Sequence, residues 1–356
     1  MGIVTALKFT PEMGAICVDQ ESWYLNRRRT LFNDILYPLN LPQFTQEFQI
    51  NWVYGAVGNP NFHMEVIQKA RKEIETKWKK GHFQNTVEIM TLSRIILKAF
   101  QQTWRRRIDD QIRFLYGFGA DDLNRGYFLD SKGQKIPIKN SKIKQYALDC
   151  VNQKEKLFFG TLPTPNHICL IGVDPNQKFS AFCIKEDQGV LSFQSGGFES
   201  LGDGCYAGAM EMARTLNLQF LSDRRQGCGR NRGVLTLLSS ILEASDHYAK
   251  IGGNIRMMIL DAQQPQEIKE LRDAPARIAL EITKSYRAQI LSQEQAEQML
   301  ADLIFHQNNW EAMEAQLFQT VSSRTALDKL LRGYKNIGEL PTLPENHPFF
   351  GKEKQL

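Results

Sequence analysis

Two apolar runs separated by a short turn open the sequence and commit its first residues to a buried hairpin. Residues 3–9 and 14–18 are largely apolar, and Thr10-Pro11-Glu12 between them has the composition of a turn. The second run ends at Asp19. We therefore predict two paired strands with a carboxylate at the exit of the second strand.

The length of the turn determines which residues face each other in this hairpin. If Pro11-Glu12 is a two-residue loop, Thr5 lies opposite Val18. In that register the Thr5 side chain faces away from Asp19, because side chains alternate between the two faces of a strand.

Helical periodicity follows a further strand at residues 48–57. Asn59-Pro60 supplies an N-cap residue and a proline suited to the first helical position. Apolar residues then recur at a spacing of three and four on both sides of Gly81, which predicts two amphipathic helices joined by a short turn. These apolar residues are Phe62, Val66, Ile67, Ala70, Ile74 and Trp78, followed by Ile89, Leu92, Ile96 and Ala99.

The second half of the chain returns to strands, then to helices, and ends the core with a strand. Such an order favours an α+β fold in which two sheets pack face to face with helices outside. The predicted elements are a three-strand meander at 167–173, 178–184 and 189–194, helices at 206–216 and 231–248, and a closing strand at 255–260.

Two segments lie outside this core. Residues 118–165 carry scattered lysines and end in prolines, so we predict an insertion or a partly mobile loop region there. Beyond Asp261 the pattern is entirely helical, with a capping box at Ser292 and Gln295, and the last residues form a proline-containing tail. The predicted organisation is a core at 1–261, including the insertion, and a helical C-terminal extension at 262–356.

Composition excludes several classes of protein. The 356 residues are 42% hydrophobic, which is enough for a sizeable core, and the net charge of +5 is well below that of a dedicated nucleic-acid binder. The six cysteines form no CxxC pair and the six histidines have no ligand spacing, so we expect no disulfide framework, metal or cofactor. Without a long apolar run, we expect no membrane span and a cytoplasmic location.

Several stretches together resemble the proteasome family, that is, the 20S beta subunits and the bacterial HslV-type proteases. They occur in the family's order between about residues 2 and 261, without the lysine-dotted segment. The stretches are Met13 to Asp19, Asp34 to Leu39, Gly55 to Gly58, Gly202 to Ala207, and Ala244 to Ile255. This resemblance implies a four-layer αββα sandwich of the N-terminal nucleophile hydrolase type that assembles into rings.

The resemblance also implies where the catalytic groups belong. Family members use an N-terminal threonine whose amine, aided by a lysine, activates the hydroxyl. Counting back from Asp19 places this threonine near Gly2 or Ile3, and the lysine position falls on Ile35, so both groups are absent. The remaining positional candidates are Asp19, Asp203 at the glycine-flanked serine, and Asp246 at the last-turn aspartate, with Thr5 as the nearest threonine.

Three interpretations remain open. The first is a noncatalytic structural or regulatory subunit, linked to proteolysis, that forms a homo-oligomer or ring and contacts protein partners through the insertion or the extension. The second is an active threonine-type peptidase or amidohydrolase exposed by cleavage before Thr5. The third is a basic-surface binding module for nucleic acid or another partner, using clusters such as Arg105-Arg106-Arg107, although no aromatic residues interleave with them.

Overall fold

The computed structural model describes residues 2–330 except for 20–21, 25–26, 30–34, 84–86, 152–165, 177, 186–188, 193–196, 218–226, 249–250, 252–253, 307–308, 322, 324–325 and 328–329. The chain divides into two compact units, Met1–Leu271 and Arg272–Leu356. No described helix combines the length and the apolarity needed to cross a bilayer.

The first unit is built on two five-stranded sheets. The first sheet has the order β12-β1-β2-β13-β14, and the second has the order β11-β10-β9-β6-β5. The first contains β1 (Ile3–Lys8), β2 (Met13–Asp19), β12 (Phe198–Gly202), β13 (Ile255–Asp261) and β14 (Ile268–Leu271). The second contains β5 (Leu36–Pro38), β6 (Asn51–Val57), β9 (His167–Asp174), β10 (Lys178–Lys185) and β11 (Gly189–Ser192), and a separate small ribbon pairs β3 (Ser22–Tyr24) with β4 (Arg27–Arg29).

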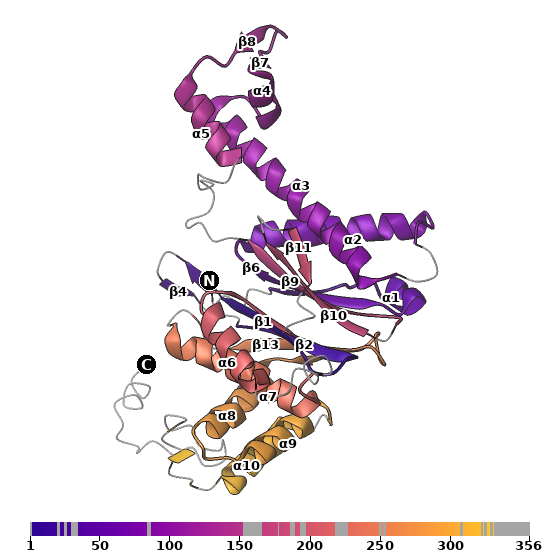
Figure 1. Cartoon of the computed structure of the whole chain (residues 1–356), viewed down its shortest axis with the longest axis vertical. Coiled ribbons are helices and arrows are strands. Elements are labelled where there is room, and N and C mark those ends of the chain that lie inside the picture. Colours follow the sequence, from indigo (N-terminus) through magenta and orange to yellow (C-terminus); the bar gives the residue numbers. More distant parts are fainter. Residues whose placement is uncertain are drawn as a thin grey trace, which may run out of the picture. The chain divides into compact units, whose positions relative to one another are not determined.

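Helices cover the outer faces of the two sheets (Figure 1). On the second sheet, α1 (Pro42–Phe48), α2 (Pro60–Lys79) and α3 (Ile89–Tyr116) share a hydrophobic cluster with β6 and β9. On the first sheet, α6 (Cys205–Asn217) packs on β12 and β1, and α7 (Arg230–His247) packs on β1 and β2. A separate cluster fills the space between the sheets, with Val4 and Ile16 on one side and Val53 and Ile171 on the other. The predicted four-layer αββα sandwich is confirmed.

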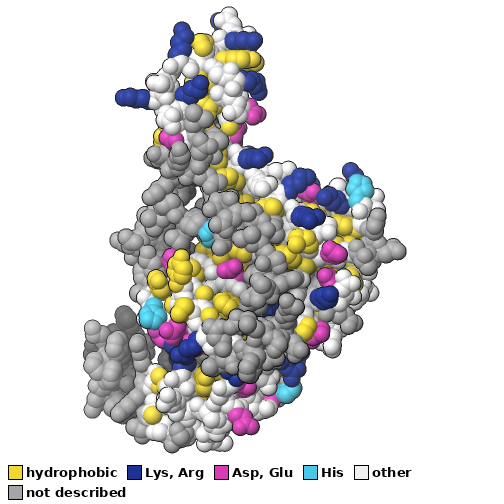
Figure 2. Space-filling view, in the orientation of Figure 1, with side chains coloured by type: hydrophobic (Ala, Val, Ile, Leu, Met, Phe, Trp, Pro, Cys, Tyr) yellow, Lys and Arg dark blue, Asp and Glu magenta, His cyan; other side chains and the backbone are white. Residues whose placement is uncertain are grey.

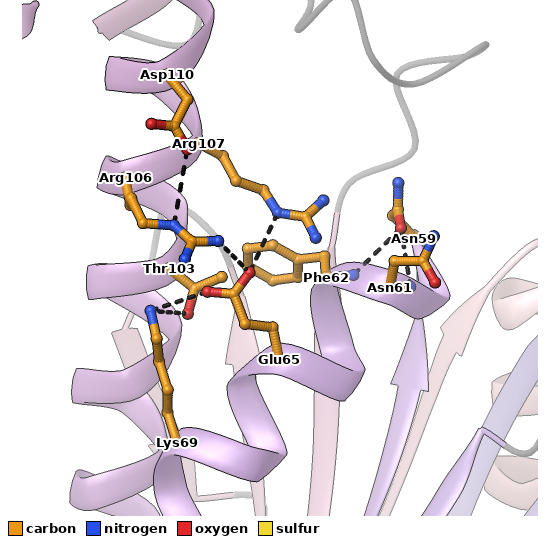
Figure 3. Close-up of polar contacts among 9 residues, drawn as sticks. All are labelled: Asn59, Asn61, Phe62, Glu65, Lys69, Thr103, Arg106, Arg107 and Asp110. Carbon is orange, nitrogen blue, oxygen red and sulfur yellow. Dashed lines mark hydrogen bonds and ion pairs between the residues drawn. The ribbon is translucent and has the colours of Figure 1, made fainter.

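The two predicted amphipathic helices are present as α2 and α3. The Asn59 side chain accepts hydrogen bonds from the backbone N–H groups of Asn61 (3.0 Å) and Phe62 (3.2 Å), as expected of an N-cap. Along the contact between the helices, Glu65 pairs with Lys69 of its own helix at 2.9 Å and with Arg106 of α3 at 2.6 Å (Figure 3). These exposed contacts orient α3, while the buried apolar stripe supplies most of the stabilisation.

The predicted loop region is wrong for residues 120–151, because they form regular structure. Helix α3 continues to Tyr116, and α4 (Ala120–Arg125), the ribbon β7 (Tyr127–Leu129) with β8 (Lys135–Pro137), and α5 (Ser141–Val151) follow. Ile108 and Ile112 of α3 share a small core with Leu123 and Ala147. We call residues 117–151 the lobe. The rest of the predicted insertion, 152–165, lies outside the described residues.

The predicted register of the first hairpin is wrong by one residue. Thr5 lies opposite Cys17, and Val4 lies opposite Val18. The turn is longer than expected because the Thr10 hydroxyl accepts hydrogen bonds from the N–H groups of Glu12 (3.3 Å) and Met13 (3.0 Å). In the observed register Thr5 and Asp19 lie on the same face of the sheet.

The described part of the second unit includes α8 (Asp273–Arg287), α9 (Gln293–Ile304) and α10 (Trp310–Thr320). The capping box is confirmed, since the Ser292 hydroxyl accepts from the N–H of Gln295 at 3.2 Å and the Gln295 side chain accepts from the N–H of Ser292 at 3.0 Å. The expectation of an entirely helical pattern after Asp261 is wrong at β14, which belongs to the first unit. The predicted proline-containing tail lies outside the described residues.

Candidate functional site at the start of the chain

Asp19 and Gly2 meet at the open end of the first hairpin. Asp19 is fully buried, and its Oδ1 accepts a hydrogen bond from the backbone N–H of Ile3 at 2.6 Å. A β-carbon added at Gly2 would overlap Oδ1 of Asp19. The carboxylate therefore fixes the first strand and occupies the place into which a side chain at position 2 would project.

The glycine-flanked turn before α6 also contacts Gly2. Gly202 has a φ of +100°, and a β-carbon on it would overlap the carbonyl oxygen of Gly2. Gly204 has a φ of +73° and lies against Ala244 and Tyr248 at the end of α7. Both glycines are required because other residues rarely adopt such φ values and no space remains for a side chain.

The structure places the four predicted site residues in different environments. Asp203 lies in the turn that contacts Gly2, so the structure brings this turn, Gly2 and Asp19 together. Asp246 is exposed on the last turn of α7. Thr5 is fully buried within β1, paired with Cys17 on one side and Ser200 on the other, and its hydroxyl donates to the carbonyl of Cys17 at 3.4 Å.

The position that the resemblance assigned to a lysine is occupied by an apolar side chain. Ile35 packs against the core between the sheets, and its carbonyl accepts the N–H of Ala56 at 3.0 Å. An isoleucine side chain has neither a donor nor an acceptor, so it cannot move a proton.

A buried arginine that the sequence analysis missed lies close to this position. Arg256 of β13 is opposite Val18, 8% exposed, and its Nε donates to Oε1 of Glu270 on β14 at 2.6 Å. Its guanidinium also contacts the carbonyl of Leu36 in the other sheet at 3.4 Å. Arg256 therefore joins the two sheets beside Ile35, and its guanidinium is engaged by an acceptor on each sheet. The sequence signal that could have identified Arg256 is its position as the one charged residue within the apolar stretch 255–260.

Other groups with nucleophilic or basic chemistry are held in inactive forms. Burial, and to a lesser extent the Asp19 charge, raises the pKa of the Cys17 thiol, so the thiol stays protonated. Burial lowers the pKa of His63 to about 4. This neutral imidazole accepts from the Tyr54 hydroxyl at Nδ1 (2.6 Å) and donates from Nε2 to the carbonyl of Val57 (2.9 Å), which commits both ring nitrogens.

Within the part of the chain that the structure describes, no group of three or more His, Cys, Asp or Glu side chains is arranged to hold a metal ion. The basic clusters differ in their surroundings. Arg106 and Arg107 both approach Glu65, at 2.6 and 3.7 Å, so part of their charge is balanced (Figure 3). A second basic cluster of the sequence, Arg224-Arg225, lies outside the described residues.

Comparison with known proteins corrects the family assignment. No family model matches the chain, and no curated protein matches it. Similar solved structures include an Anbu (Gly-1) mutant from Hyphomicrobium sp. strain MC1, with 10% identity and a TM-score of 0.46, covering 76% of this chain and 88% of that chain. Another is Anbu (ancestral beta-subunit) from Yersinia bercovieri, with 9% identity and a TM-score of 0.45, covering 76% of this chain and 87% of that one.

The assignment of the chain to the 20S beta-subunit and HslV-type family, as a divergent member, was therefore wrong. The similar structures carry the name Anbu, and neither family models nor curated proteins match the sequence. The four-layer architecture does not depend on this assignment, because the order of the strands and the packing of the helices show it directly.

Proposed function

We propose that the chain is a noncatalytic, self-associating subunit with a structural or regulatory role linked to proteolysis. The observation that carries the proposal is the contact of Gly2 with the carboxylate of Asp19. At this point an N-terminal nucleophile hydrolase requires a hydroxyl or thiol, and here the position lacks a side chain and the space for one.

The proton-transfer groups support the same proposal. Activation of a hydroxyl requires a nearby base with a suitable pKa. Ile35 has no titratable group, and the Arg256 guanidinium is held by Glu270. The Asp19 carboxylate accepts the Ile3 amide, which fixes it in a structural role.

The alternative is a threonine peptidase that begins at Thr5. Cleavage before Thr5 would remove the part of β1 that pairs with Val18 and with Leu201, and with it the hydrogen bond from Ile3 to Asp19. It would also leave the new N-terminus at a fully buried residue. Both consequences disfavour this alternative.

The test is the intact mass of the purified protein with and without an epoxyketone directed at N-terminal threonines. We expect no adduct, and no chain that begins at Thr5, in either wild type or a Thr5→Ala variant. A wild-type chain that begins at Thr5 and carries the adduct, with no adduct in Thr5→Ala, would overturn the proposal.

Self-association and partner binding are part of the same proposal. We expect light scattering after size exclusion to give a mass well above 40.9 kDa. The lobe and the second unit are the proposed contact regions for protein partners, since the lobe exposes Leu129 (52%) and Ile136 (38%) at its ribbon. Cytoplasmic location belongs to the proposal too, in keeping with the reduced, buried thiols of Cys17 and Cys169.

A further inference from the structure

The outer face of α6 exposes two large apolar side chains in a row along the helix. Tyr206 is 81% exposed and Met210 is 70% exposed. They are four residues apart and lie on the same side of the helix, followed one turn later by the Arg214 side chain at 77% exposure. Hydrophobic side chains gather on the face that α6 presents in Figure 2.

The opposite face of α6 already has its partners. Met212 and Leu216 are buried, and Gly208 lies against Ile3 of β1 and the backbone of α7. A helix at the surface of a globular domain is normally polar on its outer side. Tyr206 and Met210 are therefore surplus to the packing of the sandwich and mark a contact surface.

We infer that two copies of the chain pair through antiparallel α6 helices, with a two-fold axis beside Met210. This inference rests on the proposed self-association and names its surface. Tyr206 and Arg214 lie about 6 Å to either side of Met210 along the helix. An antiparallel partner then places each Tyr206 ring beside the other copy's Arg214, and each Met210 beside its own counterpart.

The chemistry of the row fits a second copy. The Arg214 guanidinium is attracted to the face of an aromatic ring, and the only such ring in the row is Tyr206, so the surface is complementary to itself. Glu211 holds Arg214 at 3.1 Å, which orients the guanidinium without covering both of its faces. The adjacent Ala209 and Ala213 have small side chains and permit the two helices to approach closely.

The first experiment compares the dissociation constant of self-association by sedimentation for wild type and Met210→Glu. Two carboxylates would meet at the axis, so we expect association about a hundredfold weaker. Met64→Glu is the matched control, because Met64 is also a helical methionine at the surface, 41% exposed on α2, and this variant should associate as wild type does.

The second experiment is positive and does not depend on loss of assembly. In a Cys205→Ser background, Met210→Cys should form a covalent dimer when copper–phenanthroline accepts the two electrons released as two thiols form one disulfide. Met64→Cys in the same background should remain a single chain.

The outcomes separate the two proposals. If Met210→Glu associates like wild type and Met210→Cys does not cross-link, the α6 contact is wrong while the proposed self-association stands. If wild type is a monomer at all concentrations, the proposed self-association fails and the α6 contact fails with it.

Discussion

Acid should destabilise the first unit through one buried histidine. The His63 imidazole has a pKa of about 4 in the fold against an ordinary value of 6.5, chiefly because of burial. Above pH 6.5 it is neutral in both the folded and the unfolded chain and has no effect. Below this value the unfolded chain binds a proton that the folded chain does not, so stability falls with pH until the folded pKa is passed.

The difference between the two pKa values sets the magnitude. This difference lowers the free energy of unfolding by about 2 kcal/mol at about pH 5, and by about 3 kcal/mol once the pH is below both pKa values. Urea unfolding at about pH 7.5 and pH 5 measures this cost, and His63→Gln is the control because glutamine keeps a donor and an acceptor but does not titrate. We expect wild type to lose about 2 kcal/mol more than the variant between the two pH values.

An equal loss in wild type and His63→Gln would refute this reasoning. If the variant does not fold, the wild-type His63 ring resonances provide the test instead. They should not titrate between about pH 5 and pH 8, whereas a solvent-exposed histidine passes through its ordinary pKa in that range.

Three further predictions concern the site. Arg256→Met and Glu270→Gln should each destabilise the protein by about 1–3 kcal/mol, and the double variant should lose less than the sum, because both changes weaken the same ion pair. Strict additivity in urea unfolding would contradict the pairing. Gly202→Ala should lower the melting temperature by more than Gly81→Ala, because both glycines have a positive φ but, of the two, Gly202 alone lies against backbone atoms. Equal shifts in melting temperature would refute the overlap of a β-carbon at position 202 with the Gly2 carbonyl. Asp19→Asn should weaken the hydrogen bond at the start of β1 by about 1 kcal/mol, seen as faster amide exchange there; unchanged exchange would count against its structural role.

Much of the sandwich was predictable because its patterns are local. The N-cap at Asn59 and the spacing of apolar residues in α2 and the first half of α3 determined both helices. The hairpin register was not predictable at the same level, since the Thr10 hydroxyl adds a residue to the turn by accepting two amide hydrogen bonds. The lobe was missed because its small core draws on residues spread from Ile108 to Ala147.

The candidate site, too, could be predicted from the sequence only in part. Asp19 and the glycine-flanked turn could be located from order and spacing, but their contact with Gly2 depends on how β12 pairs with β1. The partner of Arg256 was hidden for a different reason. Glu270 lies on β14, a four-residue edge strand in a stretch with helical composition, and only pairing with β13 makes it a strand.

Helix α3 limits how the lobe could be exchanged or repositioned. The same helix contributes Ile96 and Phe100 to the cluster over the second sheet and Ile108 and Ile112 to the small core of the lobe, and Trp104 packs against both. Its buried stripe must therefore keep one phase over its 28 residues. A change in the length of α3 between the two cores will therefore preserve both of them only when the helix gains or loses a near-integral number of turns, so the permitted lengths form a discrete series.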